Sequence, residues 1–213
     1  MVNDIKVAKQ VAKLLLQINA IILQPKKHFV WAAGWNSPIY CDNRKTLSYP
    51  KIRSFIKKEL SKLVRDHFID VEVIAGVATA GIPHGALIAE ELGLPFIYVR
   101  SSAKKHGKQN QIEGHFIKGQ RVVLIEDLIS SGKSSIEAAK SLRDEGMNIC
   151  GIASIFTYGF NDALINFKNA EINYISLCDY ETLLPEAINQ NILESDDLSI
   201  LMQWRENPSI WKK

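Results

Sequence analysis

The sequence lacks long apolar runs. No stretch of its 213 residues approaches the length of about 18 apolar residues that a membrane-spanning helix needs. The apolar N-terminal stretch is interrupted by Lys13 and Gln17, and no small-residue cleavage site follows it. We therefore interpret residues 4–23 as an amphipathic helix of the mature protein and expect no membrane association.

Cysteine and net charge are also scarce. The three cysteines, Cys41, Cys150 and Cys178, form an odd set without CxxC spacing, which argues against a disulfide framework or a zinc site. Two of them lie in apolar strand-like segments, where a reduced thiol is usual, so we expect a reducing cytoplasmic location. The net charge of +3, from 26 basic and 23 acidic residues, is too small to indicate nucleic acid as the main partner.

Linkers, repeats and low-complexity segments are absent as well, and the length fits one domain. The middle of the chain alternates short β-branched runs with segments of helical periodicity. This alternation predicts an α/β fold, a parallel sheet flanked by helices on both faces. The predicted strands are 71–77, 96–100, 121–127, 149–158 and 172–178; the predicted helices are 83–93 and 134–146, ended by Gly93 and Gly146, with a further helical segment between the last two strands.

The two ends of the chain differ from this middle part. Residues 1–68 predict a small hood of short strands and turns, together with the N-terminal helix and a helix over 48–68 that Ser48 caps. Residues 69–180 form the expected core. Residues 181–213 predict a helical tail.

The stretch "IEDLISSGKSS" (125–135) ends in the letters of a nucleotide-binding P-loop. That motif needs a glycine five residues before Gly132, and the chain has Asp127 there. A carboxylate at this position would repel phosphate oxygens. The stretch therefore does not predict a nucleoside triphosphatase.

A different phosphate site fits these residues. An apolar strand ends in Glu126 and Asp127, a loop of serine and glycine follows, and a helix begins. Small loop residues and a helix N-terminus bind a phosphate, and the carboxylates accept hydrogen bonds from vicinal hydroxyls. A ribose 5-phosphate carries both groups. The alternative is a solvated acidic turn, which the flanking strand and helix make less favourable.

Two further loops have a suitable placement. "AGVATAGIPHG" (75–85) joins a strand to a helix through small residues, and it fits an anion site and a tight turn equally well. The long polar loop 101–116 follows Arg100 and carries Lys104, Lys105, His106 and Lys108. Alone it would be a solvated basic loop, but beside two anion-binding loops it indicates a lid that closes on a charged substrate.

The segment "VVLIEDLISSGKSS" resembles the phosphoribosyl pyrophosphate signature of the type I phosphoribosyltransferases. "SPIYCDNR" (37–44) and the K-x-H-G letters of the loop make the chain similar to the orotate phosphoribosyltransferases. The resemblance implies transfer of a phosphoribosyl group from 5-phosphoribosyl 1-pyrophosphate (PRPP) to orotate, with Mg²⁺ held mainly by the substrate near Glu126 and Asp127. It also implies a homodimer whose lids reach the partner's site.

The resemblance assigns roles to individual residues. Lys104, His106 and Asp127 would be catalytic, and Ser130 and Tyr40 would contact orotate. The implied PRPP contacts are Arg100, Lys104, His106, Glu126, Asp127, Leu128, Ile129, Ser130, Ser131, Gly132, Lys133, Ser134, Thr79, Ala80 and Gly81.

The chain departs from some members of this family. Ser101 and Ala80 stand where lysines occur, and "FTYG" stands where an arginine for the orotate carboxylate occurs. The partner of that carboxylate therefore stays open. Two alternatives also remain: transfer to another base, and a non-enzymatic regulator with the same fold. The mixed charges of "KKELSKLVRDHF" argue against the basic face that such a regulator would need.

Overall fold

The computed structural model describes residues 2–31, 34–101 and 111–212. Its centre is a six-stranded sheet in the order β10-β9-β8-β5-β6-β7. The strands are parallel except β7, which runs antiparallel to β6. Their bounds are β5 Val73–Val77, β6 Phe96–Val99, β7 Ile112–Glu113, β8 Arg121–Ile129, β9 Asn148–Thr157 and β10 Tyr174–Asp179.

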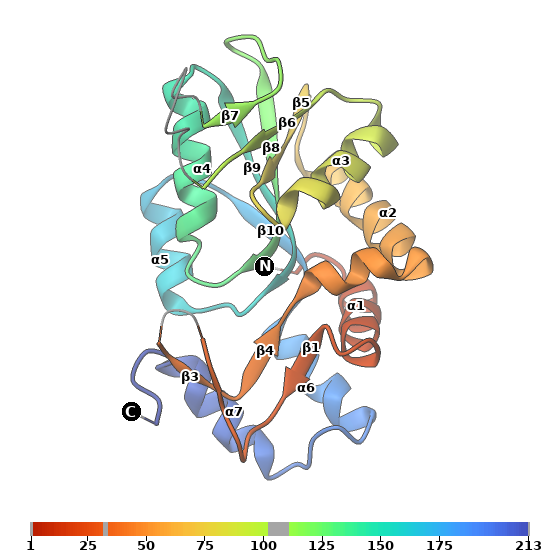
Figure 1. Ribbon diagram of the computed structural model, residues 1–213, viewed down its shortest axis with the longest axis vertical. Coiled ribbons are helices and arrows are strands. Elements are labelled where there is room, and N and C mark those ends of the chain that lie inside the picture. Colours follow the sequence, from red (N-terminus) through yellow and green to blue (C-terminus); the bar gives the residue numbers. More distant parts are fainter. Residues whose placement is uncertain (1, 32–33, 102–110, 213) are drawn as a thin grey trace.

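Helices cover both faces of this sheet, as predicted. α2 (Pro50–His67) and α3 (Gly81–Leu92) lie on one face, and α4 (Lys133–Asp144) and α5 (Asn161–Asn169) lie on the other (Figure 1). The strands between them are apolar on both sides because both sides are covered; all five residues of β5 are buried. The expected α/β fold with a mostly parallel sheet is therefore confirmed.

The N-terminal helix is shorter than predicted. α1 spans Ile5–Gln17 and buries apolar residues at helical spacing, with Asp4 accepting two backbone hydrogen bonds as its N-cap. It ends because Asn19 takes a left-handed conformation at φ 52°. The chain then enters β1 (Ile21–Leu23), so the prediction of one helix over 4–23 is wrong at its C-terminal end.

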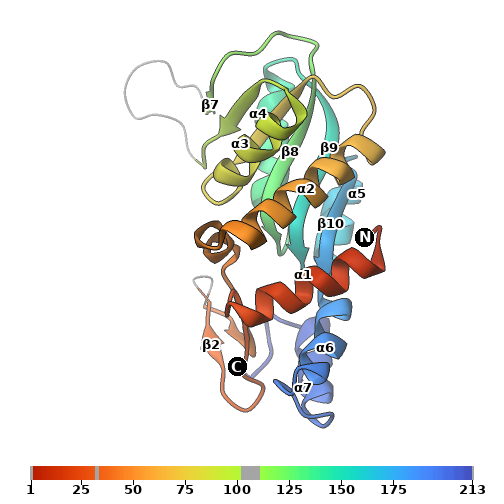
Figure 2. The same ribbon diagram turned by 90° about the vertical axis from the view of Figure 1, so that its right-hand side faces the viewer.

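Two small antiparallel sheets follow α1. β1 pairs with β4 (Ile39–Cys41), and β2 (Phe29–Val30) pairs with β3 (Asn36–Ser37). They lie beyond the ends of β8, β9 and β10, next to the C-terminal helices (Figures 1 and 2). A 3₁₀ segment, η1 (Asn43–Ser48), then leads to α2. Ser48 is thus the last residue of η1, and Tyr49 precedes α2 without a side-chain cap, so the predicted cap is wrong.

The tail consists of α6 (Tyr180–Asn189) and α7 (Asp197–Glu206). An aromatic cluster joins it to the rest of the chain: the Trp31 ring lies 5.2 Å from Tyr158 and 5.6 Å from Trp204, between ring centroids. Of the predicted hood, α1 packs against the core sheet and α6, and α2 packs against the core sheet and α3. We therefore keep the division into 1–68, 69–180 and 181–213 as a proposal.

The helices and the cysteines bear on two expectations from the sequence, that no segment spans a membrane and that the thiols are reduced. Within the described residues, no helix has the length and apolar character needed to cross a bilayer. All three cysteines are free thiols, and Cys178 is buried.

Candidate active site

The candidate site lies where the parallel strands end, at the edge of the sheet that faces the two small sheets (Figure 2). β8 runs two residues further than predicted, and Ile129 still pairs with Thr157 of β9. Leu128 and Ile129 are therefore strand residues, and the Ile129 side chain is fully buried. Any contact that Ile129 makes with PRPP would therefore come from its backbone.

The serine-glycine loop after β8 is shaped by Gly132. This residue has φ 76°, and a Cβ atom there would lie 2.5 Å from the Phe167 ring. Asn166 Nδ2 donates a hydrogen bond to the backbone oxygen of Ser131 over 3.0 Å, which fixes the position of that carbonyl group. Gly132, the N-cap residue of α4, has no side chain to cap the helix, so within the described residues its first backbone N–H groups can bind an anion.

The loop after β5 provides a second uncapped helix end. Thr79 and Ala80 form a turn after β5, and α3 begins at Gly81 without a side-chain cap. A Cβ atom at Gly81 would collide with the carbonyl oxygen of Ile125, so only glycine lets α3 start directly against β8. Because β5 and β8 are neighbours, the N-termini of α3 and α4 lie at the same sheet edge.

The two predicted carboxylates lie between these helix ends but have different surroundings. Glu126 is buried, and its oxygens accept hydrogen bonds from the Ser135 hydroxyl at 3.0 Å and from the Asp127 backbone N–H at 3.2 Å. Asp127 is half-buried and faces the segment after β4. Asp127 is thus the more accessible carboxylate for a ligand.

Burial raises the pKa of the Glu126 carboxyl well above its usual value, and the charge of Asp127 raises it further. Burial also raises the pKa of Asp127, while a hydrogen bond with Glu126 and the charge of Arg44 oppose that shift. The pair therefore retains a proton to higher pH than two separate carboxyls would. Ionising this buried pair therefore costs free energy. Hydrogen bonds donated by the O–H groups of a vicinal diol would offset that cost.

The free-energy cost of ionising Glu126 leads to a prediction about the stability of the protein. A carboxyl whose pKa is higher in the folded state makes the protein less stable as the pH rises. The loss begins at the ordinary pKa of the carboxyl, near 4.5, and continues up to its pKa in the folded state. We expect Glu126→Gln to raise the melting temperature of the ligand-free protein at pH 8, and to raise it less at pH 5. Thermal unfolding at both values measures this; about 2–4 °C corresponds to 1 kcal/mol for a chain of this size.

The exposed Glu145 supplies the control, because Glu145→Gln should show no such pH-dependent gain. A Glu126→Gln gain that is equal at both pH values would contradict the assignment of a raised pKa.

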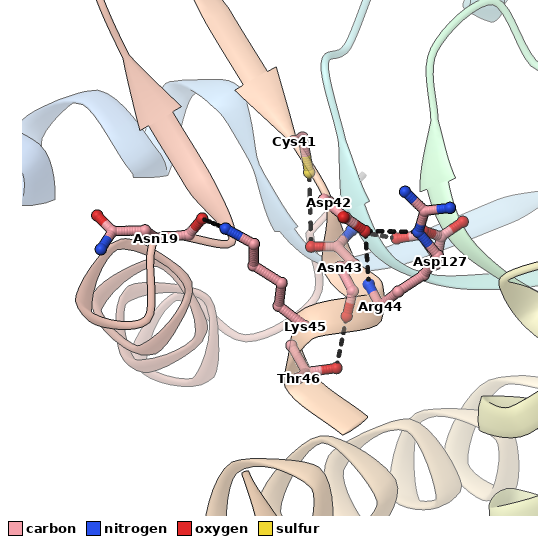
Figure 3. A network of polar contacts seen from close by, with 8 residues as sticks. All are labelled: Asn19, Cys41, Asp42, Asn43, Arg44, Lys45, Thr46 and Asp127. Carbon is pink, nitrogen blue, oxygen red and sulfur yellow. Dashed lines mark hydrogen bonds and ion pairs between the residues drawn. The ribbon is translucent and has the colours of Figure 1, made fainter. Parts of the chain in front are cut away.

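Sequence reasoning missed Asn43. It is fully buried, its Nδ2 donates to the backbone oxygen of Asp127 over 2.7 Å, and its Oδ1 accepts from the Cys41 thiol at 3.5 Å (Figure 3). Its own carbonyl accepts from the Thr46 hydroxyl at 2.6 Å. Asn43 therefore fixes the segment after β4 to the end of β8. The only sequence signal was its place inside "SPIYCDNR".

The remaining predicted residues lie around this edge or outside the described residues. Arg100 follows β6, and its guanidinium is 3.4 Å from the Glu113 carboxylate. Tyr40 lies in β4 with a 39% exposed side chain, and its ring centroid is 5.7 Å from that of Phe29. Ser130, Lys133 and Ser134 lie in or next to the serine-glycine loop. Lys104, Lys105, His106 and Lys108 fall outside the described residues.

A parallel sheet that ends in paired carboxylates between two uncapped helices has the features of a phosphoribosyl-binding protein. The family model described as "Phosphoribosyl transferase domain" matches residues 46–190. An orotate phosphoribosyltransferase of Cytophaga hutchinsonii is 53% identical over 96% of this chain and 98% of its own length. One from Phocaeicola vulgatus is 50% identical over 96% of each chain.

A solved structure gives the same result. The orotate phosphoribosyltransferase from Aeropyrum pernix aligns with a TM-score of 0.74 and 28% identity, over 83% of this chain and 97% of that one. The chain belongs to the phosphoribosyltransferases and, within them, to the orotate phosphoribosyltransferase family.

Proposed function

We propose that the protein transfers the 5-phosphoribosyl group from PRPP to orotate, giving orotidine 5′-monophosphate and pyrophosphate in de novo UMP biosynthesis. The single observation that carries the chemistry is the carboxylate pair at the end of β8, set between two uncapped helix N-termini. The relatives named as orotate phosphoribosyltransferases support orotate as the base.

The ribose phosphate would occupy the end of β8. Backbone N–H groups of the serine-glycine loop and the start of α4 would bind the 5-phosphate, and Lys133 would add a positive charge. Asp127, with Glu126 behind it, would accept hydrogen bonds from the two ribose hydroxyls. These contacts would fix the sugar so that its C1 atom faces the small sheets, where Tyr40 and Ser130 would meet the base.

The leaving pyrophosphate would lie near the start of α3. Thr79, Ala80 and Gly81 would bind it through the backbone, and Arg100 would release Glu113 to reach it. As the C1–oxygen bond lengthens, negative charge grows on the pyrophosphate, and preorganised cations stabilise that charge. We assign this role to Lys104 and His106 of a lid that serves the neighbouring site in a homodimer.

The residues present fit a magnesium ion that is carried largely by the substrate. Within the described ranges, no three His, Cys, Asp or Glu side chains form a group that could hold a metal ion. Asp127 and Glu126 would therefore supply at most one or two oxygens, and a Mg²⁺ ion readily takes its other ligands from phosphates and water. Bound there, Mg²⁺ would supply charge neutralisation to the pyrophosphate. We further propose a cytoplasmic location for the enzyme.

Spectrophotometric assay of orotate consumption with PRPP and Mg²⁺ tests the proposal. We expect turnover of orotate and a rate with uracil at least about a hundredfold lower, because a site built for a carboxylate leaves polar groups unpaired when that group is missing. Adenine and guanine serve as further controls for the base. Comparable turnover of uracil, or no reaction with orotate, would refute orotate as the substrate.

A further inference from the structure

Orotate carries a carboxylate, and the residues that end and follow β9 in the sequence are themselves uncharged. The strand ends in Thr157 and is followed by Tyr158 and Gly159. A buried or half-buried carboxylate needs a charged or strongly hydrogen-bonding partner. The identity of that partner rests on the proposed function.

Arg44 lies near the edge of the sheet that carries the candidate site. It follows β4 at the start of η1, two residues beyond Asp42, which is that segment's N-cap. Asn43, between them, is anchored to the backbone oxygen of Asp127. The anchor brings Arg44 to the end of β8, and Figure 3 shows its guanidinium turned toward Asp127.

The orientation of Arg44 leaves its binding face available. Asp42 Oδ1 accepts from the Arg44 Nε at 2.6 Å and from its backbone N–H at 3.2 Å. Within the described part of the chain, the two terminal nitrogens of the guanidinium have no such bond, and the side chain is 61% exposed. Two parallel N–H groups match the two oxygens of a carboxylate.

Arg44 lies near both Tyr40, the proposed contact of the base, and Asp127, the proposed contact of the sugar. Asp42 raises the pKa of Arg44, with smaller contributions from Tyr40 and Asp127, so both lie within electrostatic range. Tyr40 and Asp42 are two residues apart along β4 and its extension, which puts them on one face. We propose that Arg44 binds the orotate carboxylate through its terminal nitrogens and selects orotate over uncharged pyrimidines.

Three other described cations near this edge are engaged elsewhere. Arg205 reaches the end of β9, but its terminal nitrogens bond to Glu181 at 2.7 Å and to the Gly159 oxygen at 3.2 Å. Arg100 is paired with Glu113, and the proposed function directs it to the pyrophosphate. Lys45 turns away from Asp127 and donates to the Asn19 oxygen over 2.9 Å (Figure 3).

Arg44→Gln tests the proposal, with Lys45→Gln as a matched loss of one neighbouring charge. We expect Arg44→Gln to raise the KM for orotate about ten- to a hundredfold, as for the loss of a hydrogen-bonded charged partner. The dissociation constant for PRPP with Mg²⁺, measured by calorimetry, should change less than about twofold. The preference for orotate over uracil should fall by the same factor as the orotate kcat/KM. Lys45→Gln should behave as the wild type.

Retained PRPP binding shows that the variant is folded, because that site lies on the core. An unchanged orotate KM in Arg44→Gln would overturn the assignment. So would a loss of PRPP affinity with an unchanged orotate KM, which would place Arg44 on the donor. If the wild type itself fails to convert orotate, the proposed function fails instead, and the two failures are thereby distinguished.

Discussion

Lys104→Ala should lower turnover about a hundred- to a thousandfold, the usual loss when one preorganised charge-stabilising donor is removed. Lys104 belongs to the basic loop between Arg100 and β7, and we propose that it meets the pyrophosphate as charge develops there. The melting temperature should not change, since a lysine in a polar stretch of sequence brings no apolar side chain to a core. Steady-state turnover with saturating PRPP and orotate measures the effect. Lys118→Ala, an exposed lysine before β8, is the control and should remain active.

The proposed sharing of the lid adds a mixing test to this prediction. Asp127→Asn damages the body of the site and Lys104→Ala damages the lid. In a hybrid dimer with shared lids, one site has both defects and the other has neither. With free exchange, about half of the dimers are hybrids, so about a quarter of wild-type activity should return. Without any recovery under exchange conditions, Lys104 would have to act within its own chain or not at all.

Asp127→Asn should lower kcat/KM for PRPP about a hundred- to a thousandfold, while the fold persists. The amide keeps the shape of the side chain but removes the charge that accepts hydrogen bonds from ribose hydroxyls. The backbone oxygen of Asp127 still accepts from Asn43, so the strand end remains anchored. Kinetics with varied PRPP, together with thermal unfolding, separate binding from stability.

Asp144→Asn, an exposed aspartate at the end of α4, is the matched control and should keep full activity. Full activity in Asp127→Asn would disprove the diol-binding role. An unfolded variant would instead mean that this carboxylate serves the structure.

Much of the core could be predicted because its signals are local. The buried strands read as continuous apolar runs, and Gly93 ends α3 in a left-handed conformation at φ 67°, as its place after the helix indicated. The carboxylate pair was also predictable, because charged side chains at the end of an apolar run indicate the approach to a sheet edge, although β8 continues for two residues beyond them. The end of α1 was harder to predict, since apolar residues continue beyond Asn19, and their pairing with β4 cannot be inferred from those residues alone.

The contacts that complete the site were not predictable for a physical reason. Asn43 and Asp127 are 84 residues apart, and nothing in either local sequence shows that they meet. The orientation of Arg44 depends on the same contact. The extension of β8 to Ile129 depends on β9 as its partner, which a strand's own residues do not indicate. Long-range pairing therefore decides how the site is built, while local pattern decides where it lies.

The aromatic cluster has a consequence for spectroscopy. All four tryptophans, Trp31, Trp35, Trp204 and Trp211, belong to the small sheets or to the tail, and residues 69–180 contain none. Trp31 and Trp204 meet edge to face across the junction between these two parts, with Tyr158 at the end of β9 touching both. Intrinsic tryptophan emission is therefore an optical probe of the small sheets and the tail, including their junction. Residues 69–180 contribute no tryptophan emission, so no label is needed to observe the small sheets and the tail separately.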